Sequence, residues 1–123
     1  MLEDAPLEHE LHNLGNDCYR SGQFEKAVEF YCRAIEENGR MVETFFNRAL
    51  AYARLGEYDA ALNDATYVIE QNASLHDAYY LRGRIHELRL DDRAALADYD
   101  RAISLNPDFH AAVEQRATVV SRE

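Results

Sequence analysis

The sequence repeats itself at intervals of 34 residues, and this period limits the possible folds more than any other feature. Sliding the chain by one period aligns residues of similar character in many columns, with no insertion. The columns are Leu11, Phe45, Tyr79 and Val113; Gly15, Ala49, Gly83 and Ala117; Ala27, Ala61 and Ala95; Ile35, Ile69 and Ile103; and Asn38, Asn72 and Asn106. A period of this length indicates one supersecondary unit that stacks on copies of itself.

Within each period the apolar residues have helical spacing. Leu11, Leu14, Gly15 and Cys18 lie at i, i+3, i+4 and i+7, which predicts one buried stripe on a helix. A second stripe follows a break at Ser21, and the later periods repeat both stripes. The chain is therefore predicted to form seven helices, at about residues 7–20, 24–37, 41–54, 58–71, 75–88, 92–105 and 109–121.

Small residues occupy the columns where the two helices of one period are expected to approach most closely. Gly15 and Gly83 lie on the first helix, and Ala27 and Ala95 lie on the second. Larger side chains there would overpack the contact and push the helices apart.

Three helix starts carry capping signals. The candidates are Asp4 with Pro6 for the first helix, Ser74 with Asp77 as a capping box for the fifth, and Asn106 with Pro107 for the seventh.

The period and its motifs resemble the tetratricopeptide repeat (TPR) family. The runs that carry the resemblance are Leu14-Gly15-Asn16, Gly22-Gln23-Phe24-Glu25-Lys26-Ala27 and Ala102-Ile103-Ser104-Leu105-Asn106-Pro107, and the resemblance covers roughly residues 8–120. It implies an all-α fold, a right-handed α-solenoid of three helix-turn-helix units plus a seventh, capping helix. The third unit departs from the pattern, because Leu90 replaces the turn glycine and Asp92 replaces an aromatic residue. The conformation of that turn is left open.

A length of 123 residues fits one domain. We expect a single domain over 1–123, with repeats at about 8–41, 42–75 and 76–109 and a capping helix at about 109–121. On that last helix Val113, Ala117 and Val120 are expected to form the packing stripe, with Glu114 and Arg116 elsewhere. The alternative is that this helix is the first half of a truncated fourth repeat in a longer protein.

Composition excludes several classes of function. A net charge of −10 and a pI near 4.9 disfavour nucleic-acid binding. No apolar run approaches the roughly 18 residues that a membrane span needs, and the acidic N-terminus does not look like a signal peptide. With two cysteines and no export signal, we expect a cytoplasmic protein without disulfides.

The sequence does not favour an enzyme. His9 and His12 lie at i and i+3, but further metal ligands are missing and both are expected to be exposed. Cys18 occupies a packing column, so it is expected to be a buried apolar residue rather than a nucleophile. We expect no catalytic residue, no metal site and no cofactor.

Stacked helix pairs present a concave groove, lined by the residues of the first helices that lie off the packing stripe. Phe46 and Tyr80 are the expected apolar anchors, and Arg54 and Arg84 the expected contacts to anions. The full set of candidate partner-binding residues is Asn16, Tyr19, Arg20, Phe46, Asn47, Leu50, Arg54, Tyr80, Leu81 and Arg84. The alternative is that the large apolar members pack against a neighbouring repeat or the last helix.

Acidic residues of the second helices are expected to face solvent. They are Glu25, Glu29, Glu36, Glu37, Asp59, Asp98 and Asp100. The groove is then less acidic than the whole molecule, which favours a protein or peptide partner of mixed apolar and acidic character, bound either extended or as a helix.

Members of this family that bind the carboxylate-ending tails of heat-shock chaperones use a clamp of asparagines and basic residues. Asn16 and Asn47 match the asparagines, and are expected to bind a partner's backbone. The three basic positions hold His12, Asp77 and Leu81, so the two-carboxylate clamp is expected to be absent.

The resemblance thus implies a non-enzymatic scaffold or adaptor for protein interactions, monomeric or weakly self-associating. One alternative is a structural module that self-associates by stacking through Val113, Val119 and Val120 of its terminal helix. A less favoured alternative is recognition of a chaperone tail, as in a co-chaperone.

Overall fold

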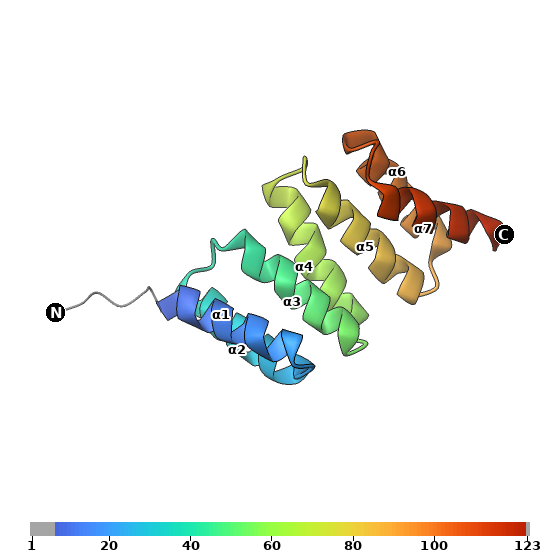
Figure 1. The fold of residues 1–123 in the computed structure, drawn as a ribbon. Coiled ribbons are helices and arrows are strands. Elements are labelled where there is room, and N and C mark those ends of the chain that lie inside the picture. The colour runs from blue at the N-terminus through green and yellow to red at the C-terminus, as the bar shows by residue number, and fades with distance from the viewer. Residues whose placement is uncertain (1–6, 123) are drawn as a thin grey trace. The chain divides into compact units, whose positions relative to one another are not determined.

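A computed structural model describes residues 7–122, and all the regular secondary structure within them is helical (Figure 1). The helices are α1 (Leu7–Arg20), α2 (Phe24–Glu37), α3 (Val42–Arg54), α4 (Tyr58–Gln71), α5 (His76–Leu88), α6 (Asp92–Leu105) and α7 (His110–Ser121). Each bound agrees with its predicted range to within one residue, so the predicted all-α fold of helix-turn-helix pairs and a seventh helix is confirmed. The expected start at Asp4 and Pro6 lies outside the described residues.

The chain divides into two compact units, which meet within α4. Unit 1 comprises α1, α2, α3 and the first part of α4, over the described residues 7–64. Unit 2 comprises the rest of α4 with α5, α6 and α7, over residues 65–122. The single domain and the repeat boundaries stay predictions, and the two units are described separately below.

Each unit is built on a glycine that lies against a tyrosine ring. A Cβ atom added to Gly15 would lie 2.5 Å from a ring carbon of Tyr31, and one added to Gly83 would lie 2.6 Å from a ring carbon of Tyr99. Both tyrosines are fully buried. The expectation that small residues mark the closest approach of paired helices is therefore confirmed at these two positions.

A buried ion pair joins α3 to α4 within unit 1. Arg48 donates from Nε and Nη2 to the two carboxylate oxygens of Asp64, both at 2.8 Å. Its third nitrogen, Nη1, lies 3.4 Å from Sγ of Cys32 on α2. Leu14 occupies the same column one period earlier and is 44% exposed, so its predicted burial is wrong. No helix in the described residues precedes α1, and Leu14 lacks the neighbour that Arg48 finds in α2.

Unit 2 repeats this arrangement one period later. Arg82 donates from Nε and Nη2 to Asp98 at 2.9 and 2.8 Å, and its Nη1 lies 3.4 Å from Oγ1 of Thr66. Asp98 is only 5% exposed, so the expectation that it faces solvent is wrong. A carboxylate in this column is buried because an arginine sixteen residues earlier supplies two charge-assisted hydrogen bonds.

The turn inside the third helix pair keeps the geometry of the other two. Leu90 has φ 66°, close to the values of 80° and 77° at Gly22 and Gly56. A leucine in this region is strained, at a cost of about 1–2 kcal/mol, since its Cβ crowds the following carbonyl. The fold thus imposes the turn on Leu90, whose side chain projects into solvent.

Two of the expected capping motifs are wrong. α5 begins after Leu75 and α7 begins after Phe109, and neither residue makes a side-chain cap hydrogen bond. Ser74 and Asp77 therefore form no capping box, and Asn106 is the C-cap of α6.

The repeated asparagines instead form the turns between helix pairs. The side chains of Asn38, Asn72 and Asn106 each accept a hydrogen bond from the backbone N–H two residues later, at 3.0, 3.0 and 3.3 Å. Such local side-chain bonds compete with the helix and favour a turn. Pro107 lies within the last of these turns rather than at the start of α7.

The face of α7 that packs on α6 also differs from the expected one. Ala112 and Val119 are fully buried, and Val119 contacts the buried pair Ala95 and Tyr99. The predicted stripe of Val113, Ala117 and Val120 is exposed instead, because α7 turns the neighbouring face, which carries Ala112 and Val119, toward α6.

We expect Gly83→Ala to lower the free energy of unfolding by about 1–3 kcal/mol, because the new methyl group must displace the buried ring of Tyr99. Gly39→Ala is the matched control, since the nearest atom to its Cβ would be 3.6 Å away. Urea denaturation followed by circular dichroism measures both variants. Equal stability of the two variants would contradict the close contact.

Candidate functional site

A polar network crosses from α1 to α3 in unit 1. His12 is 7% exposed, so the expectation that it is an exposed histidine is wrong. Its Nδ1 lies 2.8 Å from Oγ1 of the buried Thr44, and its Nε2 lies 3.5 Å from Nδ2 of Asn47. An amide nitrogen can only donate, so Nε2 of His12 accepts and Nδ1 carries the proton that it donates to Thr44.

The same network joins the two asparagines that the sequence predicts to bind a partner. Nδ2 of Asn47 donates to Oδ1 of Asn16 at 3.1 Å, and the hydroxyl of Tyr31 donates to the same oxygen at 2.5 Å. Oδ1 of Asn16 therefore has both of its lone pairs engaged. Among the residues described, Nδ2 of Asn16 and Oδ1 of Asn47 have no hydrogen-bond partner.

Burial sets the protonation of this network. Desolvation lowers the pKa of His12 below its ordinary value, so the ring is neutral near pH 7. Desolvation also raises the pKa of Tyr31 to about 12, so its hydroxyl stays a donor to Asn16. The orientation of Asn16 and Asn47 is therefore fixed near neutral pH.

A surface cavity of about 280 Å³ opens beside the network, entirely within unit 1. It is lined by Asn16, Tyr19, Arg20, Tyr31, Asn47 and Leu50. Five of these are candidate site residues from the sequence. Tyr31 was missed because its column marks it as a core residue, yet it lines the cavity and its hydroxyl bonds to Asn16.

An aromatic contact lies near this cavity. The rings of Tyr19 and Phe24 meet edge to face at 5.2 Å, and the guanidinium of Arg54 lies 4.6 Å from the centre of the Phe24 ring. Phe24 thus positions two candidate residues without being a candidate itself. Phe46 is half-buried and is not among the residues that line the cavity.

Arg20 pairs with Asp17, and this pair is exposed. Nη2 of Arg20 lies 2.5 Å from Oδ1 of Asp17, and about two thirds of each side chain is accessible. Exposed pairs of this kind contribute little to stability, so Arg20 can exchange Asp17 for another carboxylate at small cost.

The three candidate residues of unit 2 have different surroundings. Leu81 is 6% exposed, so its predicted role as an exposed contact is wrong. Buried residues lie on several sides of α5, so Leu81 is buried although it lies outside the predicted packing stripe. Tyr80 is half-buried, with ring centroids 5.7 Å from Tyr99 and 5.1 Å from Phe109.

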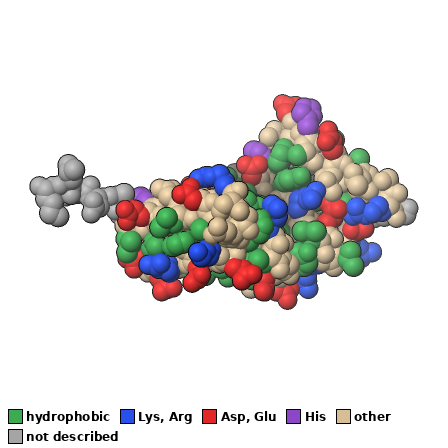
Figure 2. All heavy atoms as spheres, turned by 60° about the horizontal axis from the view of Figure 1, so that its bottom comes forward, with side chains coloured by type: hydrophobic (Ala, Val, Ile, Leu, Met, Phe, Trp, Pro, Cys, Tyr) green, Lys and Arg blue, Asp and Glu red, His purple; other side chains and the backbone are tan. Residues whose placement is uncertain are grey.

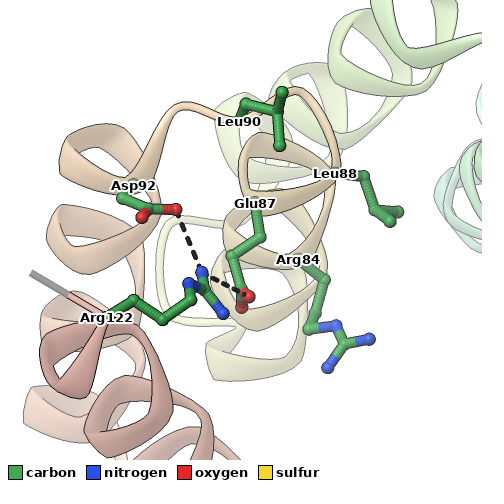
Figure 3. A pocket seen from close by; sticks show the side chains of 6 residues that line it. All are labelled: Arg84, Glu87, Leu88, Leu90, Asp92 and Arg122. Carbon is green, nitrogen blue, oxygen red and sulfur yellow. Dashed lines mark hydrogen bonds and ion pairs between the residues drawn. The ribbon is translucent and has the colours of Figure 1, made fainter.

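Arg84 lines a second surface cavity, of about 310 Å³, together with Glu87, Leu88, Leu90, Asp92 and Arg122 (Figure 3). Figure 3 shows Arg122 reaching between Asp92 and Glu87, whereas the guanidinium of Arg84 points away from both carboxylates. Within the described part of the chain, Arg84 has no ion-pair partner. It therefore remains available to an anion.

Glu87 is the centre of the contacts on that side. It accepts from the hydroxyl of Tyr99 at 2.5 Å, from Nε2 of Gln115 at 2.8 Å and from Nη2 of Arg122 at 3.0 Å. Burial acts to raise the pKa of Glu87, but these donors outweigh it and hold the pKa below its usual value. The charged carboxylate thus ties α7 to α5.

The three positions that carry basic residues in chaperone-tail binders are not basic here. His12 is neutral and buried, and Leu81 is buried. Asp77 is an exposed carboxylate whose Oδ1 lies 3.4 Å from Nε2 of His76. The absence of a two-carboxylate clamp stays a prediction.

Charges on the face drawn in Figure 2 are mixed rather than gathered by sign. On the face drawn in Figure 2, arginine and lysine side chains lie between the acidic ones. Among residues 7–122, no group of three or more His, Cys, Asp or Glu side chains could hold a metal ion. None of the described helices is long and apolar enough to cross a membrane.

Comparison with known families gives two overlapping matches to a sequence model described as Tetratricopeptide repeat, over residues 12–74 and 46–108. Among curated proteins, the chain is similar to the human small glutamine-rich tetratricopeptide repeat-containing protein alpha, at 43% identity over 54 residues. That match covers 44% of this chain and 17% of the relative, so most of the relative's length lies outside it.

Two solved structures are similar over nearly their whole length. The Arabidopsis OM64 TPR domain has a TM-score of 0.90 and 28% identity, over 95% of this chain and 97% of that one. The second TPR domain of human RPAP3, solved by NMR in complex with the HSP70 peptide SGPTIEEVD, has a TM-score of 0.83 and 27% identity. That likeness covers 91% of this chain and 97% of the RPAP3 domain.

We expect an NMR titration to give His12 a pKa below its ordinary value of 6.5, since burial disfavours the charged ring. The unfolded chain then takes up a proton at a higher pH than the folded one. The contribution of His12 to the free energy of unfolding is therefore complete above about pH 6.5 and is lost as the pH falls toward the folded pKa.

His12→Gln should reduce the loss of stability as the pH falls below about 6.5, whereas His110→Gln, at an exposed position, is the matched control and should reduce it less. A pKa of His12 at or above 6.5 would contradict the buried, neutral ring.

Proposed function

Because this chain belongs to the tetratricopeptide repeat family, we propose that it is a non-enzymatic scaffold or adaptor that binds a segment of a partner protein. The observation that carries the proposal is the arrangement of Asn16 and Asn47. Oδ1 of Asn16 and Nδ2 of Asn47 are engaged in hydrogen bonds within the described residues, whereas the other polar atom of each amide is not. Nδ2 of Asn16 is a donor and Oδ1 of Asn47 an acceptor. A peptide backbone offers the complementary carbonyl and N–H groups.

The side chains around these amides set the chemistry of the partner. Leu50 and Tyr19 offer apolar contact, while Arg20 and Arg54 offer positive charge at the same end of unit 1. A segment of mixed apolar and acidic character fits such a surface. Phe46 is a further proposed contact in unit 1, and Tyr80 and Arg84 are separate proposed partner contacts in unit 2.

The partner segment is internal rather than a carboxylate-ending tail. The similar RPAP3 domain binds an HSP70 peptide that ends in Glu-Glu-Val-Asp. In this chain the matched basic positions hold His12, Asp77 and Leu81, and each lost charge-assisted hydrogen bond weakens binding by about 1.5–3 kcal/mol. Asp77 would also repel a terminal carboxylate. We propose a cytoplasmic location for this interaction.

Self-association through α7 is the alternative function. Of the three residues it would use, Val113 and Val120 are exposed, but Val119 is fully buried under α6. This burial favours the scaffold over the self-stacking module.

Peptides selected from a displayed random library against the wild-type chain provide the probe. Asn47→Ala should weaken binding of the selected peptides about tenfold by calorimetry, because it removes an acceptor and frees Asn16 to rotate. Asn63→Ala, at an exposed position of α4 in the same unit, is the matched control and should bind as the wild type does. Circular dichroism confirms that both variants are folded.

The free-acid peptide SGPTIEEVD should bind at least tenfold more weakly than the selected internal peptides. Tighter binding of SGPTIEEVD would replace the scaffold assignment with chaperone-tail recognition. Equal affinity of the Asn47→Ala and Asn63→Ala variants would place the site elsewhere.

A further inference from the structure

His12 stands at one end of a chain of hydrogen bonds that runs to the two amides of the candidate site. Its Nδ1 donates to Oγ1 of Thr44 at 2.8 Å, and its Nε2 faces Nδ2 of Asn47 at 3.5 Å. The same Nδ2 donates to Oδ1 of Asn16 at 3.1 Å. An amide nitrogen cannot accept a hydrogen bond, so the lone pair on Nε2 of His12 is what allows Asn47 to turn its nitrogen inward.

Packing does not require a histidine at this position. Phe46 and Tyr80 follow His12 by one and two periods, and both are half-buried. A buried imidazole has a desolvation cost that a phenylalanine ring avoids. The bond from His12 to Asn47 gives a reason for a histidine here that the repeat itself does not give.

A proton on Nε2 of His12 would reverse the chain of hydrogen bonds. Nδ1 keeps its bond to Thr44, but Nε2 becomes a donor that faces the donor Nδ2 of Asn47. Flipping the amide of Asn47 brings Oδ1 to Nε2, and it also sets Oδ1 against Oδ1 of Asn16. Asn16 then flips as well and donates from Nδ2. The hydroxyl of Tyr31 tolerates this change, because a hydroxyl can accept as well as donate.

We infer that His12 is a specificity-determining residue, which decides the direction in which Asn16 and Asn47 read the backbone of a partner. With His12 neutral, the polar atoms not bonded within residues 7–122 are a donor on Asn16 and an acceptor on Asn47. With His12 protonated, the donor and the acceptor exchange places. A partner's carbonyl and N–H that match the first arrangement meet like groups in the second. The inference rests on the proposed function, because it concerns the same two amides.

The groups that face His12 determine when it takes up a proton. Burial opposes the charged ring and is the largest influence, the exposed Glu43 on α3 favours the charge, and His9 on α1 opposes it. On α2 the ring of Tyr31 lies with its centroid 5.8 Å from that of His12. Since burial outweighs Glu43, the pKa of His12 lies below its ordinary value. The reversal therefore belongs to acidic rather than neutral solution.

NMR of the chain without a partner tests the reversal itself. Above the midpoint of the His12 titration, the Nδ2 protons of Asn47 should show a nuclear Overhauser effect to the ring of His12. Below the midpoint this effect should disappear, and the Nδ2 protons of Asn16 should instead show one to the ring of Tyr31. Glu43→Gln removes a charge that favours the protonated ring, so it should move the exchange to lower pH.

Calorimetry with the library-selected peptides tests the effect on binding. The wild-type chain should bind them about fivefold more weakly one pH unit below the His12 midpoint than at about pH 7.5, and His12 should titrate about one pH unit lower in the complex, because linkage is reciprocal. His12→Gln takes up no proton in this range and should lose no affinity. His9→Gln, at an exposed position of the same helix, is the matched control and should keep the loss. Carboxylates of the peptide affect all three chains alike.

Two results would overturn the inference. The first is that the contact between Asn47 and the ring of His12 persists below the midpoint. The second is that His12→Gln loses as much affinity on acidification as the wild type. Circular dichroism over the same pH range shows that each chain stays folded. If the peptides bind Asn47→Ala as tightly as the wild type, the proposed function fails at this site, whereas the partner-free NMR still decides whether His12 reverses the amides.

Discussion

The contact of a tyrosine ring with a glycine is the constraint on which the rest of each unit depends. Tyr31 covers Gly15 and Tyr99 covers Gly83, so the paired helices approach too closely for any other residue at the glycine. The contact also determines which side chain each tyrosine hydroxyl can reach. That of Tyr31 reaches Oδ1 of Asn16, and that of Tyr99 reaches Oε1 of Glu87. One packing contact thereby orients the polar groups of the helix face beside it.

Arginines precede the glycine column by one residue, at Arg48 and Arg82, and they add a second repeated contact between helices. Arg48 and Arg82 each bind an aspartate sixteen residues later and a polar or sulfur atom sixteen residues earlier, so each side chain joins three helices. Buried ion pairs of this kind are weak sources of net stability, because desolvation offsets the attraction. Breaking one is costly, however, so the pairs favour a single register of helix on helix. Arg116, one period after Arg82, makes one such contact, to Asp100, where Arg82 bonds to both Asp98 and Thr66.

Much of this could be predicted from the sequence, because the period repeats the same local signals and fixes the helix bounds closely. The errors arose where burial depends on a distant partner. Asp98 is a charged residue of the kind expected at the surface, and it is buried because Arg82 donates two hydrogen bonds to it. His12 is buried because it donates to Thr44 and accepts from Asn47. Spacing indicated Asn16 and Asn47 as site residues, but only coordinates could reveal that Tyr31 sets their orientation.

The central claim is that the hydroxyl of Tyr31, placed by its contact with Gly15, orients the asparagines that bind the partner. Affinity for the library-selected peptides, measured for Tyr31→Phe and Tyr99→Phe, tests it most directly. Both variants keep the ring that covers a glycine and lose one buried hydrogen bond. We predict that Tyr31→Phe binds several-fold more weakly than the wild type while Tyr99→Phe binds as tightly. Undiminished affinity of Tyr31→Phe would contradict it.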